Sequence, residues 1–372
     1  MRKHSTTGKI LSLTKYGYAG PSSRYRFYNF KKCFENHGYV VTLNSFFNDR
    51  YFEKTSKLKR MLDIFWAYIQ RIILLLGLAI LPKRYDVILV EYELIPYFPP
   101  FFEYLLNRRG YKYIVDYDDP LFHRYDMHNN PLIRFFLKNK ISKVIYYATN
   151  VIVCNDYLKD YAKKYNDNLI MLPTVVKHLD SYILASDNKK NICKDDFPVT
   201  IGWIGSKTTS KFVVDILPAI ERMSKDNNVR FTLVGFDYTL LTDDEKERCN
   251  IDIVPWTEES EIMEIAKMDI GIMPLRDNPW TRGKCGFKLL QYMSCSKPVI
   301  ASPVGVNNNI VGHENGLLAN SIDDWYNAFE VLCNDGVLCQ NMGNNGLNQV
   351  KNRYNYSSNC KIYLNLIESI IG

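Results

Sequence analysis

The sequence lacks the signals of several protein classes. Its 372 residues contain no CxxC pair, no GxxxxGK[ST] loop, no short-period repeat and no low-complexity tract. These absences argue against a structural zinc site, a Walker A loop and a repeat architecture. The N-terminal segment MRKHSTTGKILSL is basic but has no sustained apolar core, so it does not resemble a secretory signal peptide.

Cysteines are present but show no pairing pattern. There are nine of them, an odd number, and they are scattered along the chain. A secreted disulfide framework would need an even set at regular spacings, so the cysteines favour a reducing, cytoplasmic compartment.

A long apolar run is also missing. The most apolar stretch, Ile72–Leu81, has ten residues and ends at Pro82. A helix needs roughly 20 residues to cross a bilayer core of about 30 Å. Extending the stretch backward meets Arg71, Gln70 and Asp63, so we do not expect a spanning helix. Two interpretations remain: a buried helix that covers a sheet, or a helix that lies in a membrane interface.

Acidic residues are scarce in the first half of the chain. Residues 1–185 hold 28 Lys and Arg against 16 Asp and Glu, a net +12, whereas residues 186–372 hold 19 against 24, a net −5. No helix-turn-helix, zinc-finger or RNP-like pattern points to nucleic acid. The asymmetry therefore favours an anionic membrane surface as a partner of the first half, with a merely solvated basic surface as the alternative.

What is present indicates two α/β domains. Hydrophobic residues make up 47% and aromatic residues 14%, which is ordinary globular composition. Short Val- and Ile-rich runs alternate with amphipathic segments in both halves, as buried parallel strands alternate with helices. The strands we expect are residues 9–13, 39–43, 87–91, 113–115, 151–154, 199–204, 229–234, 251–254, 270–273 and 298–301. The polar stretch Ser186–Phe197 is interpreted as a linker between domains 1–185 and 186–372, and the last helix can cross back to the first domain.

Two segments of the second half can bind an anion. In the first, the strand ending GWIG is followed by Ser206, Lys207 and, four residues on, Lys211, at the start of a predicted helix over residues 212–223. Free backbone N–H groups at a helix start favour phosphate, and lysines add charge. In the second, the loop holding Arg282 and Lys284 opens a helix at Gly286 and Phe287 that carries Lys288 and Gln291. The simpler alternatives are a capped turn and solvated cations.

These segments resemble the family 4 glycosyltransferases of the GT-B fold. The resemblance rests on GWIGS, on the Asp269–Leu275 segment, on GKCGFKLLQYM and on KPVIASPVGVN, with weaker matches at residues 20–26, 154–158 and 172–176. It implies two Rossmann-like domains facing across a cleft. It further implies that the second domain binds a nucleotide-sugar donor and the first binds the acceptor, with retention of configuration and without a metal ion or cofactor.

The resemblance can be carried over position by position. Gly205 and Lys211 match the family's Gly-Arg…Lys pattern for the donor diphosphate, but Ser206 replaces the Arg, so Lys207 or Lys284 must supply that charge. The family's two Glu positions fall on Gly283 and Gln291. Gln291 can still bind ribose hydroxyls, whereas Gly283 cannot replace a carboxylate.

Other candidates lie in the first half and after a later strand. Asp118 and Asp119 follow a strand where many family members have a His, and can orient the acceptor hydroxyl or stabilise positive charge. Alternatively they cap the next helix, or Asp116 and Asp118 bind a metal. The remaining candidates are Gly20, Arg24 and His123 for the acceptor and Trp256 for the nucleotide base. Arg24 can instead be a surface charge, His123 a structural residue and Trp256 part of the core.

The sequence therefore predicts a cytoplasmic glycosyltransferase, peripheral on the inner face of the membrane, that extends a lipid-linked saccharide for a surface polysaccharide. Lys211 and Lys288 would neutralise the leaving diphosphate. Two alternatives stay open: a non-catalytic scaffold subunit of a polysaccharide assembly complex, and a nucleotide-sugar epimerase of the same fold.

Overall fold

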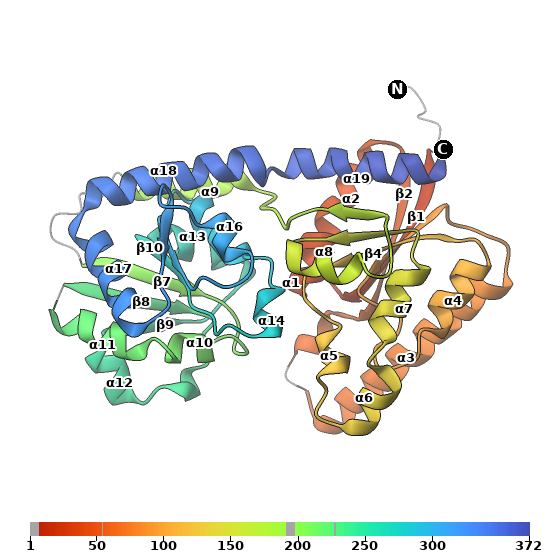
Figure 1. The fold of residues 1–372 in the computed structure, drawn as a ribbon, viewed down its shortest axis with the longest axis horizontal. Coiled ribbons are helices and arrows are strands. Elements are labelled where there is room, and N and C mark those ends of the chain that lie inside the picture. The colour runs from red at the N-terminus through yellow and green to blue at the C-terminus, as the bar shows by residue number, and fades with distance from the viewer. Residues whose placement is uncertain (1–6, 54, 191–197, 227) are drawn as a thin grey trace. The chain divides into compact units, whose positions relative to one another are not determined.

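The structure is a computed structural model that describes residues 7–53, 55–190, 198–226 and 228–372, and it divides into two units. Unit 1 comprises Met1–Thr174, Gly283–Cys285 and Tyr356–Gly372, and unit 2 comprises Val175–Arg282 and Gly286–Asn355. The chain first passes between them at Thr174 and Val175, ahead of the boundary expected at residue 185. The final helix, α19 (Tyr356–Ile371), belongs to unit 1 (Figure 1).

Unit 1 is built on a six-stranded parallel sheet with the order β2-β1-β3-β4-β5-β6. Its central strand β3 (VILVE) is buried along its whole length, because helices cover both faces of such a sheet. The strand order reverses between β1 and β3, and ligands of open parallel sheets bind at the carboxyl ends of the strands beside such a reversal. The strands are β1 (Gly8–Tyr16), β2 (Tyr39–Phe47), β3 (Val87–Glu91), β4 (Lys112–Tyr117), β5 (Asn150–Val153) and β6 (Leu169–Met171).

The helices of unit 1 fall between these strands. They are α1 (Pro21–Arg26), η1 (Tyr28–Phe30), α2 (Lys31–Asn36), η2 (Asp49–Phe52), α3 (Lys57–Ile80), α4 (Phe101–Arg108), α5 (His123–Asp126), α6 (Pro131–Leu137), α7 (Lys140–Tyr147) and α8 (Asp156–Ala162). Helix α1 ends at Arg26 and η1 begins at Tyr28, because Phe27 between them leaves the helical conformation with φ −127° and ψ −60°.

Unit 2 repeats the plan with the strand order β12-β11-β10-β7-β8-β9, again all parallel. Here the order reverses between β7 and β10, which places the expected ligand edge after these two strands. The strands are β7 (Val199–Ile204), β8 (Val229–Val234), β9 (Ile251–Val254), β10 (Ile270–Met273), β11 (Val299–Ala301) and β12 (Gly316–Leu318). Two parallel sheets confirm the predicted α/β class.

The helices of unit 2 include one that replaces part of the predicted linker. Ser186 lies inside α9, is buried, and donates a hydrogen bond to the Cys295 carbonyl at 2.6 Å, so the linker does not begin there; residues 191–197 lie outside the described residues. The helices are α9 (Leu179–Lys190), α10 (Lys211–Val214), α11 (Leu217–Asp226), η3 (Tyr238–Leu240), α12 (Asp243–Arg248), α13 (Glu258–Lys267), α14 (Pro279–Arg282), α15 (Phe287–Ser294), α16 (Asn307–Ile310), α17 (Ile322–Asn334) and α18 (Gly336–Arg353).

Helix α3 differs from the expectation of a ten-residue apolar helix. It has 24 residues and begins at the Ser56 cap, whose hydroxyl accepts a hydrogen bond from the Lys59 amide. Within the described residues it is the one helix that is long and apolar enough to cross a membrane by length and composition. Its inner face nevertheless packs against the rest of unit 1. Arg71 is buried and donates hydrogen bonds to the carbonyls of Thr14, Asn44 and Leu94.

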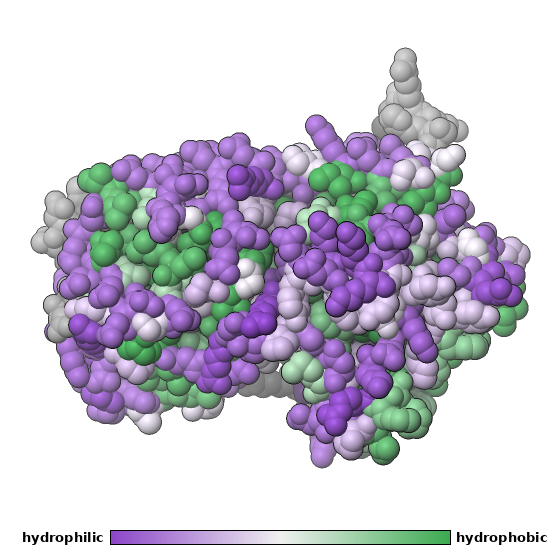
Figure 2. Space-filling model, viewed as in Figure 1, coloured by the Kyte–Doolittle hydropathy of each residue, from purple (hydrophilic) through white to green (hydrophobic). Residues whose placement is uncertain are grey.

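The outer face of α3 is exposed. Large apolar side chains here include Phe65, Trp66 and Ile73. Figure 2 shows apolar surface at the lower right of the view, in the region where Figure 1 places α3 and α6. The helix therefore combines both interpretations of the sequence: one face covers the sheet of unit 1, and the other offers apolar side chains to the outside.

Candidate functional site

In the turn after β7 of unit 2, the backbone at Gly205 lies very close to the Trp203 ring and to the backbone at Gly235. Gly205 donates a backbone hydrogen bond to the Val234 carbonyl at 3.0 Å. A Cβ at Gly205 would lie 2.3 Å from the Trp203 ring, and a Cβ at Gly235, whose φ is +73°, would lie 2.3 Å from the Gly205 carbonyl oxygen. Only glycine fits this approach.

The same turn is ordered by its own hydroxyl groups. The Thr209 hydroxyl accepts from the Ser206 amide at 3.2 Å, and the Ser206 and Thr208 hydroxyls lie 2.9 Å apart. Ser210 is buried, and its hydroxyl accepts from the Asp237 amide at 2.9 Å. Ser206, at the position where the family has Arg, is exposed.

Lys288 reaches this turn from the first turn of α15. Its ammonium lies 3.4 Å from the Thr209 hydroxyl and 4.3 Å from the centre of the Trp203 ring, within the range of a cation–π contact. The two anion-binding segments that the sequence analysis singled out thus meet at one place. A cation, helix-start amides and a glycine turn together form a site suited to a phosphate group.

The other two lysines of the predicted donor site are more peripheral. Lys207 and Lys211 are exposed, with their ammonium groups 5.8 Å from the Tyr238 ring and 5.4 Å from the Phe212 ring. The helix expected over residues 212–223 is interrupted: α10 ends at Val214, and α11 has Pro218 in its first turn, where proline is tolerated. A four-residue helix has a weak dipole, so an anion at this turn would depend on the loop amides.

The start of α15 requires glycine. Gly286 has φ +67°, and a Cβ there would lie 2.5 Å from Ile310 Cδ1. Its αL conformation turns the chain into the helix, so that the amides near Phe287 come at the helix start. Gly286 and Phe287 thus lie at a helix start, where the sequence analysis places them.

Gln291 is part of a buried network in unit 2. It is 4% exposed, and its amide donates to Glu261 Oε1 at 2.8 Å and to the Tyr182 hydroxyl at 3.3 Å. Trp256, which is half-buried, donates from Nε1 to Glu261 Oε2 at 2.9 Å. The sequence analysis missed Glu261. No motif marks it; the one available signal was its place in the helix that follows Trp256.

In unit 1, the carboxyl edge of the sheet gathers buried charges at the strand-order reversal. Glu91, at the end of β3, accepts from the Ser23 hydroxyl at 2.6 Å and from the Lys15 amide at 2.8 Å through Oε2, while Oε1 has no hydrogen-bond partner. Burial raises the pKa of Glu91 to about 8 and lowers the pKa of Lys15 to about 8. The sequence analysis missed both residues. Glu91 could have been found, because an acidic residue directly after the apolar run VILV indicates a charge at the carboxyl end of a buried strand.

Asp116 has a structural partner. Both of its oxygens accept from the Arg26 guanidinium at 2.9–3.2 Å, and both residues are 2% exposed. Burial raises the pKa of Asp116 to about 6 although Arg26 opposes the shift. Arg26 already supplies a permanent cation here, so the Asp116 and Asp118 pair does not suit a metal ion. Among the described residues, no group of three or more His, Cys, Asp or Glu is placed to hold one.

The two candidate carboxylates after β4 differ in accessibility. Asp118 is buried and accepts a hydrogen bond from the Tyr92 hydroxyl. Asp119 is half-buried and lies 3.7 Å from the Lys284 ammonium; burial raises its pKa, and Lys284 opposes the shift. Lys284, in the segment that clusters with unit 1, is thus paired with Asp119 rather than left available as a lone cation. Neither carboxylate is the N-cap residue of the next helix, α5, because that residue is Phe122.

The predicted acceptor residues are tightly packed. Arg24 is 3% exposed and lies 5.7 Å and 5.0 Å from the Tyr18 and Tyr25 rings, so the alternative of a surface charge is wrong. Gly20 precedes α1, and a Cβ there would lie 2.4 Å from Tyr16 Cβ. His123 has both ring nitrogens engaged, with Asp126 at 3.0 Å and with the Tyr157 hydroxyl at 2.7 Å, which favours its structural alternative.

Comparisons with known proteins bear on both units. Residues 198–335 match the family model "Glycosyl transferases group 1". The chain is 26% identical over 178 residues to the putative teichuronic acid biosynthesis glycosyltransferase TuaH of Bacillus subtilis (strain 168); the match covers 45% of this chain and 44%, less than half, of that protein.

Solved structures match nearly the whole chain. Anabaena Alr3699/HepE in complex with UDP-glucose superposes with a TM-score of 0.69 at 13% identity, covering 97% of this chain and 100% of that one. A glycosyltransferase from Rickettsia africae ESF-5 gives 0.69 at 14% identity and 98% of each chain. At these identities the likeness shows the fold, which confirms the GT-B class. The family match supports a nucleotide-sugar-dependent glycosyltransferase.

Proposed function

We propose that this chain transfers a sugar from a nucleotide-sugar donor to a saccharide acceptor during assembly of a surface polysaccharide, with retention of configuration and without a metal ion. The observation that carries the proposal is the approach of Lys288 to the glycine turn after β7, at the strand-order reversal of unit 2. This arrangement lies inside the segment that the family model matches. The name of the Bacillus subtilis relative supports the polysaccharide setting.

Unit 2 would hold the donor. The diphosphate would accept from the amides of Lys207 and Thr208 and from amides of the α15 start, because the Gly205 and Ser206 amides already donate within unit 2. Lys288 would be its counter-ion, and Lys211 lies a few residues further along the chain. A positioned cation is worth more when the leaving group gains negative charge in the transition state, so Lys288 would favour departure of the diphosphate. The Trp256, Glu261 and Gln291 network would border the base and ribose, in keeping with the family resemblance.

Unit 1 would bind the acceptor, and Asp119 is the better-placed of the two carboxylates to touch it. Asp118 is buried and held by Tyr92, so it would position the neighbouring loop. Asp119 is half-buried beside Lys284, and it can accept a hydrogen bond from a sugar hydroxyl or stabilise positive charge at the anomeric carbon. We also propose that unit 1 associates with the cytoplasmic face of an anionic membrane, since its half of the sequence carries the net positive charge.

A second candidate is a scaffold subunit that does no chemistry. The observation that favours it is Gly283, which takes the position of a family carboxylate and whose Cβ, if present, would lie 2.6 Å from Pro120. A carboxylate side chain does not fit there without a shift of Pro120. Sugar recognition by that residue is therefore absent from this chain.

Isothermal titration with nucleoside diphosphates, followed by a transfer assay with the bound nucleotide's sugars, tests the proposal. We expect a nucleoside diphosphate to bind equally well with and without EDTA. If no nucleoside diphosphate binds, the proposed transfer reaction is contradicted and the scaffold alternative is favoured. Binding without transfer to any saccharide or lipid-linked saccharide, or release of an epimerised donor, would also contradict the proposal.

A further inference from the structure

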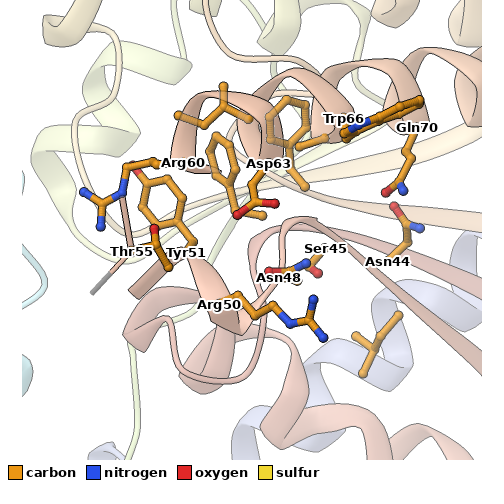
Figure 3. A pocket seen from close by; sticks show the side chains of 15 residues that line it. Asn44, Ser45, Asn48, Arg50, Tyr51, Thr55, Arg60, Asp63, Trp66 and Gln70 are labelled. Atoms are coloured by element: carbon orange, nitrogen blue, oxygen red, sulfur yellow. The ribbon is translucent and has the colours of Figure 1, made fainter. Parts of the chain in front are cut away.

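Unit 1 contains a cavity that the proposed chemistry does not use. It has a volume of about 500 Å³ and lies at the carboxyl end of β2, between η2 and the first half of α3 (Figure 3). Strand β2 is the edge strand beside β1, one strand away from the reversal between β1 and β3. The cavity shares with that reversal the carboxyl-end side of the sheet, the side on which ligands of parallel sheets bind.

The lining of this cavity is polar and carries two arginines. Asn44, Ser45 and Asn48 supply amides and a hydroxyl, while Arg50 comes from η2 and Arg60 from α3. Asp63 is the one carboxylate among its lining residues. Two guanidinium groups against one carboxylate give a net positive charge, and guanidinium is suited to phosphate because it can donate two parallel hydrogen bonds.

One wall of the cavity is a stable aromatic cluster. Tyr51 stacks on Phe47 with ring centres 4.5 Å apart, and Tyr16 packs 5.4 Å from Tyr51. The neighbouring Asp49 accepts from the Ala19 amide at 2.8 Å, which ties η2 to the loop after β1. The cavity is thus held by the same loop that the sequence analysis assigned to the acceptor.

The outer face of α3 continues from this cavity. Trp66 lines the cavity and is 56% exposed, so it belongs to both surfaces. Met61, Leu62, Phe65 and Ile73 lie on the same side of the helix at helical spacing, each more than half exposed. A ligand with a polar head in the cavity therefore meets an apolar surface directly beside it.

The charges at the start of α3 match an anionic partner. Its first turn has no acidic residue and carries Lys57, Lys59 and Arg60. Cations at a helix start are unfavourable for the helix dipole, so these side chains do not stabilise the helix itself. They are placed to meet anionic head groups, because a negatively charged lipid surface attracts nearby Lys and Arg side chains.

The anchoring of Arg71 decides how α3 can meet a membrane. If α3 left unit 1 to cross a bilayer, the carbonyls of Thr14, Asn44 and Leu94 would lose their buried donor. A buried carbonyl left without a donor destabilises the fold. Helix α3 is therefore expected to lie along an interface, as amphipathic monotopic helices do.

We propose that the cavity between β2, η2 and α3 binds the phosphate-bearing head group of an amphiphile, whose apolar chain lies along the outer face of α3. The inference rests on the proposed function, for which it names the acceptor class, a lipid-linked saccharide phosphate. A second protein chain as the occupant is disfavoured because an apolar face that runs into a cationic polar cavity matches the two parts of an amphiphile.

The test uses the full chain without nucleotide and titrates farnesyl phosphate below its micellar concentration, with farnesol and inorganic phosphate as separate arms. The wild type is expected to bind farnesyl phosphate at least tenfold more tightly than either control ligand. The double variant Arg50→Gln/Arg60→Gln removes both guanidinium groups, and Asn44→Trp fills the cavity. Both are expected to weaken binding tenfold or more.

Arg108→Gln/Lys112→Gln is the matched control, because it removes two exposed cations of unit 1 away from the cavity lining, and it should bind like the wild type. Equal binding by all variants, or equal binding of farnesol, would overturn the inference. Equally tight inorganic phosphate would make the cavity a free-anion site and would also overturn it. Each variant is checked for an unchanged thermal midpoint and for nucleoside diphosphate binding. If the wild type binds farnesyl phosphate but binds no nucleoside diphosphate, the proposed function is contradicted while the amphiphile result stands.

Discussion

At the residue scale, the same residue type has different roles according to its surroundings. Lys288 is half-buried against the Trp203 ring and the Thr209 hydroxyl, whereas Lys225 is exposed and pairs with Glu221 one helical turn away. A half-buried cation is already partly desolvated and oriented, so it interacts more strongly with a bound anion than an exposed one does.

Replacing Lys288 with Ala is expected to weaken nucleoside diphosphate binding by about 10- to 150-fold, since a hydrogen bond to a charged group is worth about 1.5–3 kcal/mol. Isothermal titration measures the change. Lys225→Ala is the control and should bind normally. If the two variants bound alike, Lys288 would not be a donor ligand.

The ion pair between Arg26 and Asp116 is expected to be structural. Asp116→Asn leaves a buried guanidinium without its paired carboxylate, and breaking a buried pair in this way costs about 3–5 kcal/mol. Urea unfolding should show this loss. Asp252→Asn removes one partner of an exposed pair with Arg230 and should leave the curve unchanged. Normal stability of Asp116→Asn would contradict the assignment.

Glu91 should make the stability of unit 1 depend on pH. Its folded pKa, about 8, lies above the value near 4.3 of an unfolded Glu, so the folded state binds the extra proton between these pH values. The contribution of Glu91 is therefore fully present below pH 4 and is lost as the pH rises toward 8.

Glu91→Gln cannot lose this proton. Its thermal midpoint, compared with that of the wild type, should rise steadily from pH 5 to pH 8. A difference that stays constant over this range would show that Glu91 does not titrate in the folded protein.

At the scale of elements, the start of α15 depends on one backbone conformation. Gly286→Ala places a Cβ at φ +67° and against Ile310, so we expect about 1–2 kcal/mol of strain and a displaced helix start. Both the melting temperature and the nucleoside diphosphate affinity should fall.

Gly336→Ala is the matched control for this variant. Gly336 begins α18 and has nothing within 4 Å of a Cβ position, so alanine should be tolerated or mildly stabilising. Unchanged nucleotide affinity in Gly286→Ala would mean that the α15 start does not contact the donor.

At the scale of the whole molecule, charge and apolar surface act on the same partner. We expect the full chain to sediment with vesicles containing anionic lipid but not with neutral vesicles, and to be released as salt rises, because screening weakens the attraction of the basic half. Phe65→Ser/Ile73→Ser should lower the bound fraction by reducing the apolar area of α3. Leu184→Ser removes an exposed apolar side chain of unit 2 and should have no effect. Salt-independent binding to neutral vesicles would contradict the claim that the basic half of the chain attracts the protein to anionic lipid.

The sequence alone determined the strands and the motif-bearing turns. Five of the ten strands expected, among them residues 199–204 and 229–234, have the observed bounds, because a buried parallel strand must be continuously apolar and is bounded by polar or small residues. The short edge strands β6 and β12 were missed, since three residues carry too little periodicity. Glycine positions such as Gly205 and Gly286 were also visible, because close backbone approach permits no other residue.

Only the tertiary structure decided the partners of buried charges and the surface that α3 exposes. The sequence cannot tell that Asp116 pairs with Arg26 while Asp119 meets Lys284, because contacts between distant segments depend on how strands order within the sheet. The length of α3 was underestimated for the same reason. Arg71 and Asp63 resemble interruptions of an apolar run, but Arg71 is satisfied by three backbone carbonyls brought together by unit 1, and burial of a charge is tolerable only where the fold supplies such partners.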